Sequence, residues 1–196
     1  MGAPRLSAPA RREQIFDVAI EVFGRAGYHG ASMNDIAEAA GVTKPVLYQH
    51  FESKSDLYRA LLDEVGTRIL GAIVKATANA IDGKEQTMRG FEAYFRWVAD
   101  HHHEFMLLFG GSARHEPEFS AQIRRITDDA AAAIAPLIAV DIDSEHRDTV
   151  AHAIVGLAEG ASRRLVGLGE AFDADEIARE VGILAWAGLR AVHRID

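Results

Sequence analysis

The sequence contains no cysteine. Disulfide bonds, cysteine-ligated zinc sites and thiolate nucleophiles are therefore excluded, and the composition suits a reducing compartment. Long apolar runs are lacking too, because the longest, residues 130–140, is too short to span a bilayer and contains Pro136. The first residues include basic side chains but no apolar stretch of the secretory type, so we expect a cytoplasmic protein.

Alternating strand patterns and glycine-rich phosphate loops are also missing, and helical periodicity replaces them. Apolar residues recur at three- and four-residue spacing over residues 11–26, and Gly27 is expected to end that helix. We predict short helices beginning after Ser32 and Thr43, and a long helix beginning after Ser53. Five further helices are expected at about 85–100, 102–113, 118–139, 144–167 and 174–194, with Pro136 kinking or ending one of them. The sequence thus predicts an all-α fold of about nine helices.

Three helix starts carry the pattern of a capping box, in which a cap side chain and an acidic side chain three residues later bond each other's backbone N–H groups. These pairs are Ser32 with Asp35, Ser53 with Asp56, and Asp173 with Glu176. They fix the expected beginnings of three helices.

Negative charge is unevenly spread along the chain. The net charge is −8 for 196 residues, yet residues 1–60 hold seven basic and seven acidic residues and are neutral. The remaining residues carry the whole excess of acid. A neutral segment with local basic points can approach DNA phosphates, which would repel the acidic remainder.

The stretch "GVTKPVLYQHFESKSDLYRALL", residues 41–62, follows a short helix and a glycine-containing turn. Two short helices supported by a first helix form a helix-turn-helix, whose second helix enters the major groove of DNA. On that second helix Leu47 and Phe51 share the face expected to point to the core. The outward residues are Pro45, Val46 and Gln49, flanked by Lys44, Tyr48 and His50. The alternative is a solvated, well-capped helical hairpin.

Residues 31–62, "ASMNDIAEAAGVTKPVLYQHFESKSDLYRALL", preceded by "IFDVAIEVFGRAGYHG", resemble the tetracycline-repressor (TetR) family of bacterial transcription regulators. The segment "LAWAGLRAV" is similar to the last helix of that family. The resemblance implies a homodimer that offers one recognition helix to each half-site of a pseudo-palindromic operator. It implies base contacts from Lys44, Pro45 and Val46 and phosphate contacts from Tyr48, His50 and Lys54, and the further candidates are Arg11, Arg12, Ser32, Asn34, Thr43 and Gln49.

Two positions depart from the pattern of the family. Asn34 stands where many relatives carry arginine, and Val46 where many carry threonine or serine. A guanidinium and a hydroxyl contact are therefore lost, although asparagine can still bond adenine or phosphate and valine can touch a thymine methyl. The operator of a relative cannot be transferred to this chain.

The expected division of the chain is a disordered tail at 1–10, a helix-turn-helix domain at 11–52 and a ligand-binding and dimerisation domain at 53–196. The resemblance implies a small-molecule pocket in the last of these, and large apolar side chains at helical spacing suit an apolar or aromatic ligand. The candidates are Phe91, Phe95, Met106 and Phe109. The alternative for each of them is ordinary core packing.

The last two helices carry features of a helix–helix dimer interface. Small residues allow a close helix approach, and the sequence places apolar ones beside them. The interface candidates are Gly156, Gly160, Leu184 and Gly188, with Ile177, Val181 and Leu189 on the same predicted face. The alternative is a single bundle that hides these residues internally.

Enzymatic chemistry finds little support. The run His101–His103, with Glu104, His115 and Glu116 nearby, could indicate a metal site, but neighbouring side chains on a helix point about 100° apart. The segment "GGSAR" lacks the closing glycine of a nucleophile elbow, and the pair Glu159 and Arg163 suits a helix-face ion pair. We expect no cofactor, no metal and no catalysis, and a repressor released by a small molecule. The alternatives are a ligand-binding helical protein without DNA function and a histidine-dependent metalloenzyme.

Overall fold

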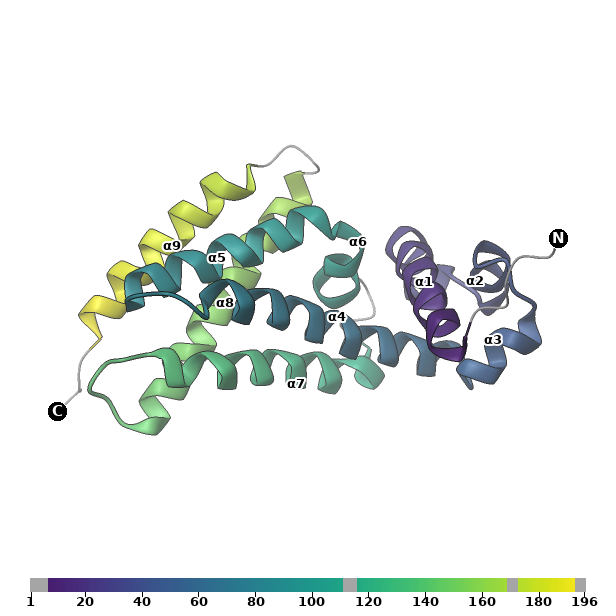
Figure 1. The fold of residues 1–196 in the computed structure, drawn as a ribbon, viewed down its shortest axis with the longest axis horizontal. Helices are drawn as coiled ribbons and strands as arrows, with labels where there is room; N and C mark the ends of the chain where they lie inside the picture. Colours follow the sequence, from purple (N-terminus) through teal and green to yellow (C-terminus); the bar gives the residue numbers. More distant parts are fainter. Residues whose placement is uncertain (1–6, 111–115, 169–172, 193–196) are drawn as a thin grey trace.

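The computed structural model describes residues 7–110, 116–168 and 173–192, and within them the chain is helical without strands. The helices are α1 (Ala8–Gly30), α2 (Met33–Ala39), α3 (Lys44–His50), α4 (Lys54–Thr77), α5 (Gly83–Asp100), α6 (His102–Phe105), the π-helix η1 (Met106–Gly110), α7 (Pro117–Ile134), the 3₁₀-helix η3 (Ala135–Leu137), α8 (Ser144–Leu168) and α9 (Ala174–Ala191). The predicted all-α class is confirmed. Figure 1 shows α1 to α3 at one end and the remaining helices at the other, with α4 running between them.

The N-terminal unit consists of α1, α2 and α3 around a small apolar core. Ile15, Ile36 and Leu47, one from each helix, are fully buried. Gly27 has φ +69°, so the regular part of α1 ends there as predicted, and Gly41 has φ +62° in the turn before α3. Both positions lie in the left-handed region that glycine enters without steric cost.

Helix α4 begins next to this unit and extends into the larger bundle (Figure 1). The Ser53 side chain accepts a hydrogen bond from the Asp56 N–H at 3.0 Å, as a cap should. The Asp56 carboxylate accepts a hydrogen bond from the Glu52 N–H at 3.0 Å. The predicted capping box would instead bond the Asp56 carboxylate to the Ser53 N–H. The bond that forms therefore involves the residue before the predicted one.

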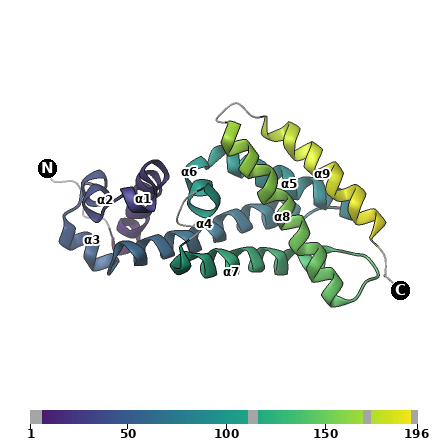
Figure 2. The same cartoon turned by 180° about the vertical axis from the view of Figure 1, so that it is seen from behind.

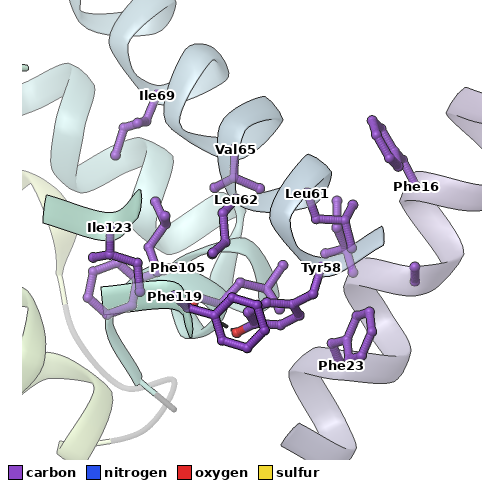
Figure 3. Packing of buried hydrophobic residues seen from close by; sticks show 14 of the residues in the cluster. Phe16, Phe23, Tyr58, Leu61, Leu62, Val65, Ile69, Phe105, Phe119 and Ile123 are labelled. Carbon is purple, nitrogen blue, oxygen red and sulfur yellow. Dashed lines mark hydrogen bonds between the residues drawn. The ribbon is translucent and has the colours of Figure 1, made fainter. Parts of the chain in front are cut away.

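The junction between the two units is filled with aromatic side chains from four helices, shown in Figure 3. The Tyr58 ring of α4 packs edge-on against Phe23 of α1 and tilts against Phe119 of α7. Its hydroxyl donates to the Leu107 carbonyl of η1 at 3.1 Å, and burial raises the pKa of this hydroxyl above its usual value. Phe105 is fully buried in the same core. This continuous core, with Phe105 of α6 in it, joins α1, α4, α6 and α7, and the hydrogen bond to Leu107 links η1 to it.

The larger bundle pairs α5 with α9 and α7 with α8, as the reverse view in Figure 2 also shows. Gly182 of α9 allows the close approach of α5, because a Cβ there would lie 2.8 Å from the Met88 sulfur. Ala131 and Ala151 are buried in a second, smaller apolar cluster where α7 and α8 meet.

Several predicted boundaries differ from the structure. Helix α1 begins at Ala8, capped by the Ser7 hydroxyl, so residues 8–10 belong to the helix rather than to a tail. The helix expected at 102–113 is a single α-turn followed by the π-helix η1, and its last residues lie outside the described part of the chain. Pro136 ends α7 as predicted, since regular helix stops at Ile134 and a 3₁₀ turn contains the proline.

Candidate DNA interface and ligand cavity

The outward face of α3 carries the side chains predicted to meet DNA. Lys44, Pro45 and Gln49 are exposed, and the Tyr48 side chain is 49% exposed although it is large and aromatic. Leu47 is fully buried on the opposite face, and the structure also buries Phe51 just after the helix. Val46 and His50 are half-buried at the edges of the exposed strip. The strip and its edges form one contiguous segment, made of Thr43, Lys44, Pro45, Val46, Tyr48, Gln49 and His50. This segment is called the α3 face below.

The starts of α2 and α3 differ in how they are capped. The predicted capping box of α2 is present, because the Ser32 hydroxyl accepts from the Asp35 N–H and the Ser32 N–H donates to the Asp35 carboxylate at 2.9 Å. Thr43 occupies the cap position of α3, but its side chain makes no capping hydrogen bond. Asn34 is exposed in the first turn of α2.

The two arginines at the start of α1 are held against the unit by their neighbours. The Arg12 guanidinium lies 4.6 Å from the centre of the Phe51 ring and 4.9 Å from that of Phe16, as a cation–π pair. Arg11 donates to the Gln14 side chain at 2.6 Å, and Gln14 in turn donates to the Ala40 carbonyl at 3.4 Å. Both positive charges are thereby held beside the helix-turn-helix.

Lys54 has a role that its sequence position did not indicate. Its ammonium donates to the carbonyls of Tyr28 at 2.8 Å and Ala31 at 3.0 Å, and lies 4.4 Å from the centre of the Tyr28 ring. These carbonyls belong to the end of α1, where the helical hydrogen bonding has stopped. Lys54 therefore fastens the first turn of α4 to the end of α1, and two of its three N–H donors are engaged within the chain.

A cavity of about 830 Å³ lies between α4, α5, η1, α7, α8 and α9. Of the predicted ligand-binding residues, Phe91 and Phe109 line it. Phe95 is fully buried in the core and Met106 lies outside the lining, so the structure places these two away from the cavity. Most of the lining is aliphatic or aromatic, with residues such as Ile73 and Ile154 on facing helices.

Polar groups interrupt this apolar lining at one wall. Glu159 of α8 has a side chain only 8% exposed, and its carboxylate accepts from the Thr127 hydroxyl at 3.1 Å and from the Arg163 guanidinium at 3.3 Å. The predicted ion pair of Glu159 with Arg163 is confirmed, but the sequence did not show that its acid is buried. Nearby, the Ser162 hydroxyl donates to the Tyr94 hydroxyl at 3.2 Å. Glu159, Thr127 and Tyr94 all line the cavity.

The predicted interface residues on α8 and α9 lie at the surface. Gly156, Gly160 and Gly188 are exposed, and a Cβ at any of them would meet nothing within 4 Å. Leu184 is 61% exposed, and the neighbouring Ile183 is 57% exposed. The predicted apolar face of α9 is divided, however, because the structure packs Ile177, Val181 and Leu189 within the subunit. The exposed part is a small apolar surface on the outer side of α9.

The histidine run does not converge on a common point. His101 stacks on the Trp97 ring and bonds the Trp97 carbonyl at 3.0 Å, and His103 packs against Gly24 of α1. His115 falls outside the described residues. In the parts of the chain that the structure describes, no group of three or more potential ligands could hold a metal ion, and no helix is long and apolar enough to cross a membrane.

Comparison with known proteins gives matches over both units. Residues 15–61 match the model described as bacterial regulatory proteins of the tetR family, and residues 84–188 match the model described as tetracyclin repressor-like, C-terminal domain. The HTH-type transcriptional activator FasR of Mycolicibacterium smegmatis is 31% identical over 190 residues, which cover 96% of this chain and 87% of FasR.

Two solved structures extend the comparison. A TetR-like transcriptional regulator from Rhodococcus sp. RHA1 is 30% identical, covers 96% of this chain and 100% of its own, and superposes with a TM-score of 0.75. The regulator FadR of Bacillus subtilis, solved in complex with stearoyl-CoA, is 19% identical, covers 92% of this chain and 99% of its own, and has a TM-score of 0.79. The second of these shows a shared fold alone.

Proposed function

The chain belongs to the TetR family of bacterial transcription regulators, and we propose that it binds a pseudo-palindromic operator as a homodimer and releases it when a small molecule fills the cavity. The α3 face is the observation that carries this proposal. It combines an exposed lysine, an exposed tyrosine and an exposed amide on a helix whose other side is anchored by Leu47. A helix of this kind presents base-reading groups in the major groove and phosphate-binding groups on its walls.

In the proposed complex the residues of the α3 face make two kinds of DNA contact, with base edges and with phosphates. Lys44, Pro45 and Val46 lie at the start of α3 and are proposed to meet base edges, while Tyr48 and His50 meet phosphates. Gln49, Thr43, Ser32, Asn34, Arg11 and Arg12 complete the proposed contact surface. We propose that Lys54 acts by positioning α4 rather than by touching DNA.

The homodimer is proposed to form through α8 and α9. The exposed glycines of α8 leave room for a close helix approach, and Leu184 on α9 offers apolar area that water would otherwise cover. A two-fold dimer would place two α3 faces in successive major grooves when their separation matches one turn of DNA, about 34–36 Å, or a multiple of it.

The cavity supports a ligand with a long apolar body. Its volume of about 830 Å³ lies within the usual range of ligand pockets, and most of its lining is apolar. The Bacillus subtilis protein of the same fold was solved with stearoyl-CoA, which makes an acyl chain a reasonable first candidate. An aromatic ligand stacked on Phe91 and Phe109 is the second.

Release of DNA follows from linkage between the two sites. Gly66, Ile69 and Ile73 of α4 line the cavity, while the first turn of α4 is fastened to α1 by Lys54. A ligand that binds better when α4 is displaced shifts the dimer away from the DNA-binding spacing. Coupling of about 1–3 kcal/mol, typical of allostery, changes DNA affinity about 5–150-fold.

We propose repression as the outcome, since a dimer bound across a promoter excludes polymerase from it. FasR is described as an activator, and the position of the operator relative to the promoter decides whether binding represses or activates transcription. In either case the protein acts where the chromosome lies, in the cytoplasm, and it performs no catalysis.

The test is selection of bound fragments from the source genome, followed by gel-shift titration at two salt concentrations. Recovery of a pseudo-palindrome is the expected result, and Lys44→Met is expected to weaken binding to it by about 1–3 kcal/mol and to relax preference at one base pair. Lys75→Met removes the same charge from an exposed position far along α4 and should leave binding unchanged. Equal effects of the two substitutions would show that α3 does not read the DNA.

A further inference from the structure

The cavity reaches the surface between α4 and α7. Two residues of α4, Asp63 and Thr67, and two of α7, Arg125 and Asp129, line the cavity and are exposed to solvent. We propose that ligands enter the cavity between these two helices, and that the ion pair of Asp63 with Arg125 is a latch across the entrance. This inference rests on the proposed role of the cavity as the ligand site, and it adds the route by which that site is reached.

The helices α4 and α7 lie side by side, as Figures 1 and 2 both show. Their side-chain contacts follow in the same order along both helices, and they are Arg59 with Glu118, Asp63 with Arg125, and Gly66 with Ile126. Beyond this level both helices contribute lining residues to the cavity, among them Leu70 of α4 and Ala130 of α7. The α4–α7 contact therefore gives way to the cavity just past the ion pair.

The ion pair at the start of this opening joins two exposed side chains. The Asp63 carboxylate and the Arg125 guanidinium are 2.8 Å apart, and their side chains are 52% and 62% exposed. Such a pair is held weakly, because water solvates both charges when the two groups separate. Both residues line the cavity, so their separation moves two lining groups apart and widens the opening.

The end of the cavity at α5, α8 and α9 is held by stronger contacts. The Arg147 guanidinium of α8 donates to the carbonyls of Val140 at 3.0 Å and Ile142 at 3.3 Å, and thereby fixes the chain that follows α7. The Trp186 ring of α9 lies 3.5 Å from the place that a Cβ on Gly83 would occupy, and both residues line the cavity. Entry at this end would require the backbone to move, whereas entry between α4 and α7 requires the movement of side chains only.

Apolar side chains at the surface mark the same entrance. Val74 is 53% exposed, and Leu137, which lines the cavity, is 43% exposed. Val74 follows Leu70 by one turn of α4, and the order of the α4–α7 contacts brings it level with the end of α7, which Leu137 follows. These two side chains offer apolar contact to a ligand as it leaves water.

A latch has a kinetic signature that differs from that of a binding contact. The ligand passes the latch in both directions, so weakening it raises the association and dissociation rate constants by the same factor and leaves Kd unchanged. Stopped-flow mixing of the full-length protein, without DNA, with the apolar fluorophore N-phenyl-1-naphthylamine measures both constants. Arg125→Met removes the ion pair and should raise both by about 2–5-fold, the factor that corresponds to the strength of a surface pair.

Arg96→Met is the matched control for this substitution. Arg96 of α5 pairs with Asp175 of α9 at the same distance of 2.8 Å, their side chains are 58% and 55% exposed, and neither residue lines the cavity. This variant should leave both rate constants unchanged. Equal effects of Arg96→Met and Arg125→Met would show a general loosening of the bundle and overturn the latch.

Closing the entrance covalently tests the route itself. The chain has no cysteine, so the double variant Asp63→Cys and Arg125→Cys carries two thiols alone, which bismaleimidoethane can join. The crosslinked protein should bind and release the fluorophore about 10-fold or more slowly than the same variant capped with N-ethylmaleimide, at a similar Kd. The same crosslink between Arg96→Cys and Asp175→Cys should change neither rate constant.

Each failure points to a different part of the proposal. Unchanged rate constants in the crosslinked protein would overturn the entrance and leave the cavity as a ligand site reached elsewhere, and unchanged rate constants in Arg125→Met would overturn the latch. A changed Kd with one rate constant unaffected would also overturn it, since that marks a contact with the bound ligand. Absence of saturable fluorophore binding to the wild type would overturn the entrance together with the cavity's assigned role, whereas the gel shift tests the DNA function separately.

Discussion

Lys54→Met tests whether Lys54 holds the two units together. The substitution keeps the length and most of the packing of the side chain but removes the ammonium. The two carbonyls at the end of α1, those of Tyr28 and Ala31, then lose donors at 2.8 and 3.0 Å. The cation–π contact with the Tyr28 ring is lost as well.

The cost can be estimated from these contacts. A hydrogen bond from a charged group contributes about 1.5–3 kcal/mol when buried, and the contacts of Lys54 are part-buried, so each is discounted to about 1 kcal/mol. The ring contact adds about 0.5 kcal/mol at a half-exposed site. The free energy of unfolding should thus fall by about 2 kcal/mol, which for a chain of this size lowers Tm by about 4–8 °C.

Thermal melting by circular dichroism at fixed protein concentration measures the shift, and Lys44→Met serves as its control. Lys44 is exposed on the α3 face, so its loss should leave Tm unchanged and weaken DNA binding. Lys54→Met should lower Tm. At temperatures below its melting range, this variant should bind DNA with unchanged affinity and unchanged salt dependence. A normal Tm combined with a salt slope lowered by about one would refute the reasoning and show that Lys54 contacts a phosphate.

Two further substitutions test the packing of the bundle and its outer face. Gly66→Ala would place a Cβ 2.8 Å from a methyl group of Ile126, so the free energy of unfolding measured in urea should fall by about 1–2 kcal/mol. Gly71→Ala, in the same helix, meets nothing within 4 Å and should raise the free energy of unfolding by about 0.5–1 kcal/mol. A rise for both substitutions would contradict the close α4–α7 contact. Leu184→Glu should convert the proposed dimer to a monomer, as measured by light scattering. Ile81→Glu, at a residue that is 88% exposed, is the control and should leave the measured mass unchanged. An unaltered dimer in both variants would place the interface elsewhere.

The sequence was informative where local chemistry decides the structure. The cap at Ser32, the left-handed glycine at Gly27 and the stop at Pro136 all follow from groups within a few residues, and the structure confirms each of them. The same holds for the burial of Leu47, because a seven-residue helix with a single large aliphatic side chain leaves little choice of inner face.

It was less informative about the cavity, because periodicity shows which face of a helix turns inward and not whether a neighbour fills the space there. Phe91 and Phe95 belong to the same stripe of α5, yet Phe91 lines the cavity and Phe95 is packed in the core. The difference depends on where α4, α5 and α7 separate, which involves residues distant in the sequence. The burial of Glu159 was missed for the same reason, since an acid four residues before an arginine has the pattern of a surface pair.

Lys54 shows how one side chain can change the interpretation of a whole segment. In the sequence it is a basic residue next to a recognition helix, which favours a phosphate contact, but the end of α1 leaves carbonyls without partners and the ammonium bonds two of them. The consequence concerns regulation rather than stability alone. In the proposed mechanism, α4 is one helix from its fastened first turn to the cavity residues Ile69 and Ile73, so a displacement of α4 at the cavity would move α1 and with it the α3 face. In the proposed mechanism, a loose contact at Lys54 would let α4 shift while the DNA-binding unit stayed in place, so the coupling between ligand and DNA depends on this contact being kept.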